Sequence, residues 1–141
     1  MERVIKFRAW LPQVGRMGMV TSIRGTNETY RPTTIVAEYL TVDGKQRFYT
    51  AYTFELMQFT GLLDKNAVQM FESDIIEAND VYGKYIGHIV WWEDRWALTY
   101  LGQDKVTPQF QSLMTVRNPI IVGNVFESPE LINNEEERLK K

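Results

Sequence analysis

Short runs of β-branched and aromatic residues, separated by turn-forming residues at regular spacing, constrain the fold of this chain most strongly. The clearest pair of runs, Ile35–Val42 and Gln46–Tyr52, flanks the dipeptide Asp43-Gly44. An Asp-Gly between two such runs is the strongest short-range signal for a β-hairpin. Near the start, Ile5–Leu11 alternates apolar and polar residues, which is typical of a half-buried strand. The pattern predicts a mainly β fold, in the form of a small barrel or a strongly bent antiparallel sheet.

A second hairpin is predicted in the aromatic part of the chain. Gly87–Trp92 and Trp96–Leu101 are strand-like by residue type, and residues 93–95 between them are predicted to form a three-residue loop. Large apolar side chains occupy both faces of the first strand, so the hairpin is either covered on both sides or presents an exposed aromatic face. Three shorter segments are also strand-like: Met17–Ile23, Leu56–Phe59 and Ile120–Val122.

Two segments have helical features. In residues 66–77, Val68, Phe71 and Ile75 have helical spacing, but the alternative is two short strands with a break between them, Gln69–Phe71 and Asp74–Ala78. Periodicity alone does not decide between these interpretations. Near the end of the chain, the sequence Ser128-Pro129-Glu130 is typical of a helix start. We therefore expect one or two short helices and a C-terminal helical tail on a β-rich α+β fold.

Length and composition indicate a packed protein. A chain of 141 residues, 44% of them hydrophobic and 13% aromatic, fits one ordinary domain. We expect a single domain over residues 1–132 and a charged tail over residues 133–141. The chain has no cysteine, which excludes disulfide scaffolds, thiolate zinc sites and cysteine nucleophiles. No cofactor is expected.

The charge of the chain is uneven. Residues 1–50 hold eight Lys/Arg and four acidic residues, while the rest holds eight and fourteen, for a total of −2. This balance argues against a nucleic-acid-binding protein, although the N-terminal excess allows a local basic patch. We expect no signal peptide at the charged N-terminus and no membrane span, because no apolar run approaches about 18 residues. We expect a soluble cytoplasmic protein.

Seven short sequence motifs, in three segments at the start, in the middle and near the end of the chain, resemble those of the YopX family of phage and prophage proteins. They are RAW at residues 8–10, MQFTGL and DKN between residues 57 and 66, MFE and DII between residues 70 and 76, and GNVF and SPEL between residues 123 and 131. The resemblance implies a β-rich fold, a phage or prophage origin and a soluble product. It supplies no catalytic or binding residues, because none is established for the family. The DII stretch after a turn is also similar to strand entry in SH3-like barrels.

Two positions depart from the family pattern. Ala67 and Ser73 stand where the family usually has glycine. Glycine is the residue that adopts positive φ at least cost. Either the local turns differ in this chain, or these positions never needed positive φ.

The polar candidates for a reactive site are few. His88 is the only histidine, which we interpret as a surface or packed residue, and it rules out motifs that need two histidines. Glu72, Asp74 and Glu77 form the best acidic cluster. On a strand, Glu72 and Asp74 would share a face about 6–7 Å apart, which could suit a divalent cation or paired-carboxylate chemistry. We favour the interpretation of a solvated strand edge or turn.

The aromatic candidates are more prominent. Three tryptophans lie close together in the second predicted hairpin, and an exposed face there could stack bases or grip a peptide. The alternative is that they belong to the core. At the N-terminus, an arginine beside a tryptophan gives a weaker basic and aromatic pair. The candidate partner surface therefore consists of Arg8, Trp10, Trp91, Trp92 and Trp96.

Three functions follow from these candidates. The leading hypothesis is a non-catalytic interaction module that binds a host or phage macromolecule. The second is nucleic-acid binding through the tryptophans and a positive groove lined by Arg8, Arg16, Arg24 and Arg31. The third is a cation-dependent enzyme that uses the acidic cluster, which requires its carboxylates to converge in a pocket. We expect self-association and a monomeric state equally for a small protein of this kind.

Overall fold

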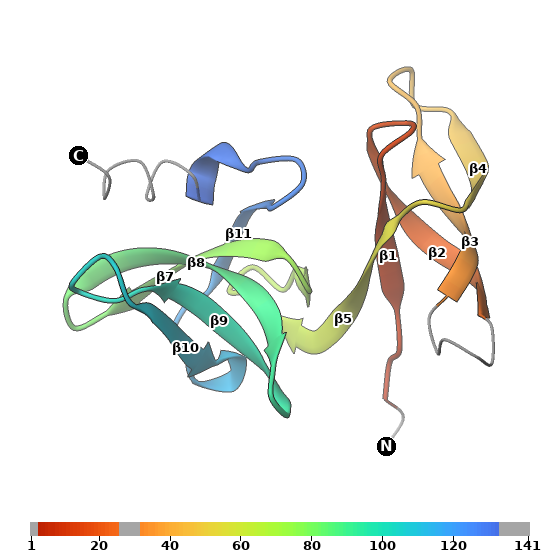
Figure 1. The fold of residues 1–141 in the computed structure, drawn as a ribbon. Helices are drawn as coiled ribbons and strands as arrows, with labels where there is room; N and C mark the ends of the chain where they lie inside the picture. Colours follow the sequence, from red (N-terminus) through yellow and green to blue (C-terminus); the bar gives the residue numbers. More distant parts are fainter. Residues whose placement is uncertain (1–2, 26–31, 133–141) are drawn as a thin grey trace. The chain divides into compact units, whose positions relative to one another are not determined.

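The computed structural model describes residues 3–25 and 32–132, and in these ranges it is mainly β, as predicted (Figure 1). The strands are β1 (Phe7–Leu11), β2 (Arg16–Gly25), β3 (Pro32–Leu40), β4 (Gln46–Ala51), β5 (Glu55–Leu63), β6 (Gln69–Phe71), β7 (Asp74–Asp80), β8 (Gly83–Trp92), β9 (Arg95–Leu101), β10 (Pro108–Ser112) and β11 (Ile120–Asn124). A short 3₁₀ helix, η1, spans Leu113–Thr115.

The strands form two open antiparallel sheets. One has the order β4-β3-β2-β1-β5-β6 and the other the order β10-β9-β8-β7-β11. In neither sheet do the two outermost strands pair with each other, so neither sheet closes into a barrel, and the barrel alternative of the prediction is wrong. The prediction of antiparallel, mainly β structure is confirmed.

The chain divides into two compact units, Met1–Gln58 and Phe59–Lys141. The boundary falls inside β5, whose first residues pair with β1, while Phe59 and Leu63 pair with β6. The prediction of one domain over residues 1–132 did not include this division. The predicted charged tail, residues 133–141, lies outside the described residues.

The first unit is built around the predicted Asp43-Gly44 hairpin. β3 and β4 pair from Leu40–Gln46 to Ile35–Ala51, and Gly44 has the positive φ of 82° that the turn requires. Thr41 closes the loop, because its backbone N–H donates to the Lys45 carbonyl at 2.8 Å. One face of the sheet carries the buried core residues Ala9, Leu11, Ile35, Ala37 and Ala51.

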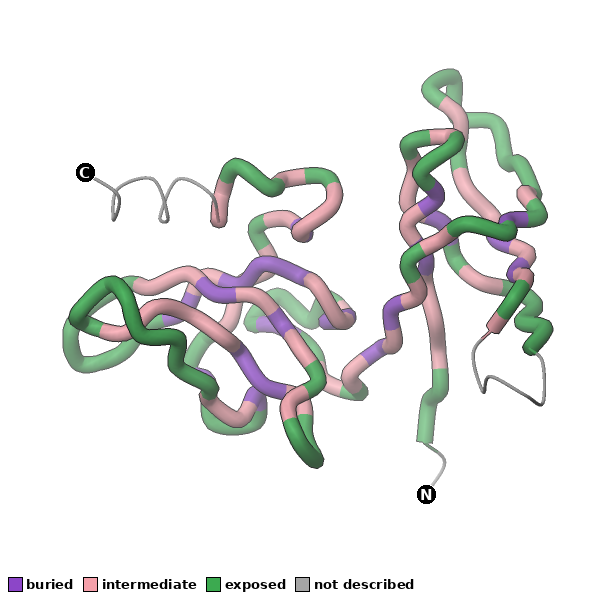
Figure 2. Tube along the Cα trace, in the orientation of Figure 1, coloured by how far each residue is buried: buried purple, intermediate pink, exposed green. Residues whose placement is uncertain are grey.

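The second unit has its core on one face of the five-stranded sheet. The buried residues of this core are Met70, Ile76, Ala78, Ile89, Leu98, Leu113 and Val116. Figure 2 shows the buried positions in the first part of β7 and in the middle of β8 and β9, while the turns that join these strands are exposed. Aliphatic side chains from neighbouring strands therefore supply the apolar contacts that hold this unit together.

Residues 66–77 form the two strands β6 and β7, so the helical interpretation is wrong. The break between them is a turn at Ser73, whose N–H donates to the Ile89 carbonyl of β8 at 2.8 Å. Phe71 pairs with Phe59 across the sheet, and their rings lie 5.6 Å apart. These long-range pairings outweigh the helical spacing of the apolar residues.

Other boundaries differ from the prediction in smaller ways. The loop of the β8–β9 hairpin has two residues rather than three, because Trp92 pairs with Arg95. The strand β10 was not predicted. β11 contains a bulge between Ile121 and Gly123. Beyond β11, the backbone N–H of Leu131 donates to the Ser128 carbonyl at 3.1 Å, which starts a helical turn; the rest of the predicted helical tail lies outside the described residues.

Ala67 and Ser73 both have positive φ, of 63° and 73°. The turns therefore keep the backbone that the glycines of the family suit, and the side chains at these positions are strained. We expect Ala67→Gly and Ser73→Gly each to raise the free energy of unfolding by about 0.5–1 kcal/mol, since the left-handed region costs a non-glycine residue about 1–2 kcal/mol and part of the gain is lost to unfolded-state entropy. Chemical denaturation of the two variants tests this, and a loss of stability in both would contradict it.

Candidate functional site

The buried polar residues of the described chain are Asp64, Asp74 and Asn124, and all three belong to the family motifs. Asp64 Oδ1 accepts the backbone N–H groups of Asn66 at 2.8 Å and Val68 at 2.9 Å. Its Oδ2 accepts the N–H of Ile121 at 3.1 Å, from β11. Asp64 therefore shapes the β5–β6 turn and ties it to a strand 57 residues away in sequence.

Asp74 and Asn124 fix two other turns. Asp74 Oδ2 accepts the N–H of Phe71 at 2.8 Å, across the turn that contains Ser73. Asn124 Oδ1 accepts the N–H groups of Phe126 and Glu127, and its Nδ2 donates to the Glu127 carboxylate at 2.9 Å. Buried polar groups need such partners. The role of these three motif residues in the structure is therefore to accept backbone N–H groups and so hold the turns in shape.

The predicted acidic cluster does not form a site. Glu72 and Ser73 lie in a turn, as the favoured interpretation has it for Glu72, so Glu72 and Asp74 do not share the strand face that the cation-site alternative requires. Asp74 is committed to the N–H of Phe71, and Glu77 forms an ion pair with Lys84 at 3.5 Å. In the residues that the structure describes, no group of three or more acidic, histidine or cysteine side chains could hold a metal ion.

His88 lies in β8, opposite Ile75 of β7 and Thr99 of β9. It is half-buried and lines a cavity of 180 Å³ whose other walls are mainly apolar, including Leu101 and Pro108. A single imidazole in such surroundings suits packing rather than metal binding.

The N-terminal candidates Arg8 and Trp10 lie on one face of β1, opposite to the face of the buried residues Ala9 and Leu11. Both side chains are half-buried. Arg16 pairs with Leu11 and so lies on the core face, away from Arg8.

Arg24 lies on the same face as Arg8. It pairs with Thr34, the neighbour of the core residue Ile35, which places it opposite to the core face. The arginines of the predicted groove therefore point to both faces of the sheet, and Arg31 lies outside the described residues. A single positive groove lined by Arg8, Arg16 and Arg24 is not formed.

The tryptophans of the second unit form two pairs at one end of the five-stranded sheet. Trp91 and Trp96 are cross-strand neighbours with ring centroids 4.9 Å apart in an edge-to-face arrangement. Trp92 stacks on Phe110 of β10, with centroids 4.8 Å apart and an interplanar angle of 10°. Because neighbouring residues of a strand point to opposite faces, the two pairs lie on different faces of the sheet.

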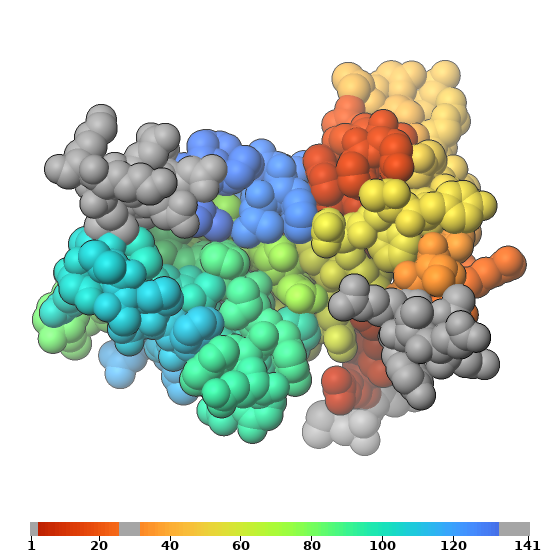
Figure 3. Space-filling model, in the orientation of Figure 1, coloured from red at the N-terminus to blue at the C-terminus, as the bar shows by residue number. Residues whose placement is uncertain are grey.

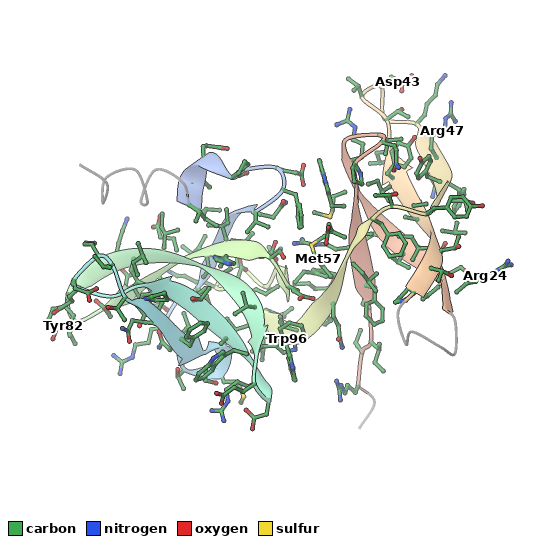
Figure 4. The ribbon with its side chains drawn as sticks, in the orientation of Figure 1. Arg24, Asp43, Arg47, Met57, Tyr82 and Trp96 are labelled. Carbon is green, nitrogen blue, oxygen red and sulfur yellow. The ribbon has the colours of Figure 1, made fainter. Side chains whose placement is uncertain are left out.

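This aromatic end is open to solvent. Trp91 is 54% exposed and Phe110 is 42% exposed, while Trp92 and Trp96 are half-buried. In Figure 4, Trp96 lies near the end of the sheet opposite to the β7–β8 turn that carries Tyr82, and Figure 3 shows the β8–β9 turn at the surface. The candidate surface therefore divides between the two units, with Arg8 and Trp10 in the first and the tryptophan pairs in the second.

The turn that joins β8 and β9 is acidic. Asp94 Oδ1 accepts the Nε–H of Arg95 at 2.8 Å, and this contact lowers the pKa of Asp94 and raises that of Arg95. Glu93 forms no ion pair with any residue that the structure describes. In this turn, Asp94 and Arg95 neutralise each other. Glu93 adds a further carboxylate two residues after the exposed Trp91.

A polar cavity of 400 Å³, which the sequence did not indicate, lies near the β7–β8 turn. The Tyr85 hydroxyl donates to Gln111 Oε1 at 2.7 Å at its wall, and Asp80 and Arg117 also line it. Burial, with smaller contributions from Tyr100 and Asp80, raises the pKa of Tyr85 to about 12. Tyr85 therefore stays a neutral hydrogen-bond donor, and the cavity can accommodate a small polar molecule.

Fold and site together define a mainly β protein of two antiparallel sheets whose characteristic polar residues fix turns. The chain belongs to the YopX family, since the family described as YopX protein matches residues 6–133. The crystal structure of protein EF1440 from Enterococcus faecalis is similar in fold, with a TM-score of 0.63 and 21% identity over 93% of this chain and 99% of that chain. The comparison with curated proteins gives no match.

None of the helical segments in the described part of the chain has the length and apolar character needed to cross a membrane.

Proposed function

We propose that this protein is a non-catalytic interaction module of phage or prophage origin, which acts in the bacterial cytoplasm by binding a host or phage protein. The observation that carries the proposal is the exposed aromatic end of the β8–β9–β10 sheet. Trp91 and Phe110, on opposite faces of this end of the sheet, each offer a large apolar surface beside polar turns. Such aromatic residues are the type that dominates the binding energy of protein interfaces.

The dispersal of the acidic cluster supports the non-catalytic part of the proposal. A hydrolytic or metal-dependent site needs carboxylates that converge, whereas Asp74 and Glu77 each have a structural partner. An SH3-like arrangement of strands stays a prediction.

Nucleic-acid binding is less well supported. Arg16 and Arg24 lie on opposite faces of the first sheet, and the aromatic end carries an acidic turn. A phosphate backbone needs a continuous cationic track.

A pull-down of the tagged protein from a bacterial host lysate, with and without nuclease, tests the proposal. We expect a protein partner that survives nuclease, and at least about ten-fold less of it with Trp91→Ala, as for a central aromatic contact. The matched control is Tyr82→Ala, which removes an aromatic side chain that is 77% exposed at the other end of the same sheet. Equal capture by the two variants would contradict the proposed surface, and loss of the bound material with nuclease would favour nucleic acid.

A further inference from the structure

We infer that the end of the β8–β9 hairpin recognises a lysine- or arginine-bearing segment of a protein partner, through the indole of Trp91 and the carboxylate of Glu93. The inference rests on the proposed function, because it assigns a chemistry to the partner of the same surface. It follows from the aromatic pair, the charge of the turn and the backbone at Glu93.

Trp91 presents an aromatic ring that is held in place. Its cross-strand contact with Trp96, at 4.9 Å and 75°, fixes one side of the indole, while 54% of the residue remains open to solvent. Indole is the aromatic group that binds cations best through its π-system, and Lys and Arg side chains are its usual partners. A ring that is already ordered loses little entropy when it binds.

Glu93 supplies a negative charge beside this ring. It follows Trp91 by two residues, so their Cα atoms lie within about 7 Å of each other. Asp94 is already bonded to Arg95 at 2.8 Å, whereas Glu93 acts on Arg95 only through its charge and forms no ion pair in the described part of the chain. Glu93 is therefore the carboxylate of this turn that is available to an incoming cation.

The backbone at Glu93 is strained. Its φ is 57°, at the first position of a two-residue hairpin loop, where glycine is the favoured residue. The left-handed region is disfavoured for any residue that carries a Cβ. Strain of this kind collects at functional positions, and here the loop holds the carboxylate at the tip of the hairpin.

The same geometry disfavours an anionic partner. Arg95 is the positive residue of the turn, and its guanidinium is engaged by Asp94. Glu93, Asp94 and Arg95 together carry a charge of −1. A phosphate or an acidic peptide would meet net repulsion at this end of the sheet, whereas a Lys or Arg side chain meets both the indole and the carboxylate.

The test is an NMR titration of the full chain with an arginine-rich peptide, its glutamate-substituted counterpart and oligothymidylate. The four tryptophans give four separate indole N–H signals, which Trp→Phe variants assign. We expect the arginine-rich peptide to shift the Trp91 and Trp96 signals and to leave Trp10, in the other unit, unchanged. Binding should weaken as the salt concentration rises, because the contact is exposed.

Variants at Glu93 separate recognition from folding. Glu93→Gln keeps a similar side chain without the charge, and we expect about three-fold weaker binding, since an exposed ion pair is worth a few tenths to 1 kcal/mol. Glu93→Gly should weaken binding to the same extent while it stabilises the fold, a combination that a purely structural role would not give. Glu55→Gln, an exposed glutamate in the other unit, is the matched control and should bind as the unchanged protein does.

The outcomes are distinct. Equal shifts with the glutamate peptide or with oligothymidylate would overturn the inference, as would unchanged affinity in Glu93→Gln. If the arginine-rich peptide fails to bind while Trp91→Ala still loses its partner from the lysate, the inference fails and the proposed function stands. If the peptide binds as expected but Trp91→Ala captures its partner normally, the cation site is supported and the proposed function fails.

Discussion

Replacing Asp64 by alanine is expected to lower the free energy of unfolding by about 4 kcal/mol, because three backbone N–H groups lose a charged acceptor. These groups belong to Asn66 and Val68 in the β5–β6 turn and to Ile121 in β11. The carboxylate is 7% exposed, so water replaces these contacts poorly. Urea denaturation followed by tryptophan fluorescence measures the loss.

Two variants control for this effect. Asp64→Asn keeps one carbonyl oxygen for the turn but places an amide against the N–H of Ile121, so we expect an intermediate loss. Asp104→Ala removes a carboxylate that caps the backbone N–H groups of Val106 and Thr107 in an exposed loop, without a long-range partner. A similar loss in Asp64→Ala and Asp104→Ala would show that the link to β11 contributes little.

The contribution of Asp64 should also depend on pH. Burial alone would raise the pKa of Asp64, but the hydrogen bonds from Val68, Ile121 and Asn66 together lower it below its ordinary value of 3.8. A carboxyl group whose pKa is lower in the folded state stabilises the fold above the unfolded pKa. This stabilisation is lost as the pH falls through the folded pKa. The difference in stability between the unchanged protein and Asp64→Ala should therefore be full near neutral pH and shrink in acid.

Hairpins could be predicted from neighbouring residues in the sequence. Features that depend on pairing between distant segments could not. The Asp43-Gly44 turn was predicted correctly because its geometry is set by two residues and their immediate neighbours. The edge strand β10 was missed because its sequence, Pro-Gln-Phe-Gln-Ser, carries little apolar pattern. This segment forms a strand because its backbone pairs with β9. The division at Gln58 was hidden because β5 runs through it without a linker.

The candidate site could be predicted only in part. Sequence indicated the aromatic group around Trp91, because aromatic residues are rare enough to stand out as a cluster. It could not tell that Trp91 is exposed while Trp96 also packs against the core, because exposure depends on position relative to the end of the sheet. The alternative of an acidic site fails for a related reason. The positive φ of Ser73 turns the chain there and separates Glu72 from the strand that holds Asp74.

Gly87→Ala is expected to cost about 3 kcal/mol, at the upper end of the range for an overpacked core. Gly87 pairs with the buried Ile76, so a side chain here would point to the core face of β8. Its Cβ would lie 2.4 Å from the Thr99 carbonyl oxygen and 2.9 Å from Leu98 Cγ. The carbonyl belongs to the backbone of β9, so relief requires the two strands to separate rather than a side chain to rotate.

The matched control is Gly102→Ala, in the same unit. There the added Cβ would meet the side chain of Gln109 at 3.1 Å, which can move aside at little cost. We expect a change of less than about 1 kcal/mol for Gly102→Ala, as for an exposed substitution. Equal stabilities of the two variants would mean that β8 and β9 tolerate a wider spacing at Gly87.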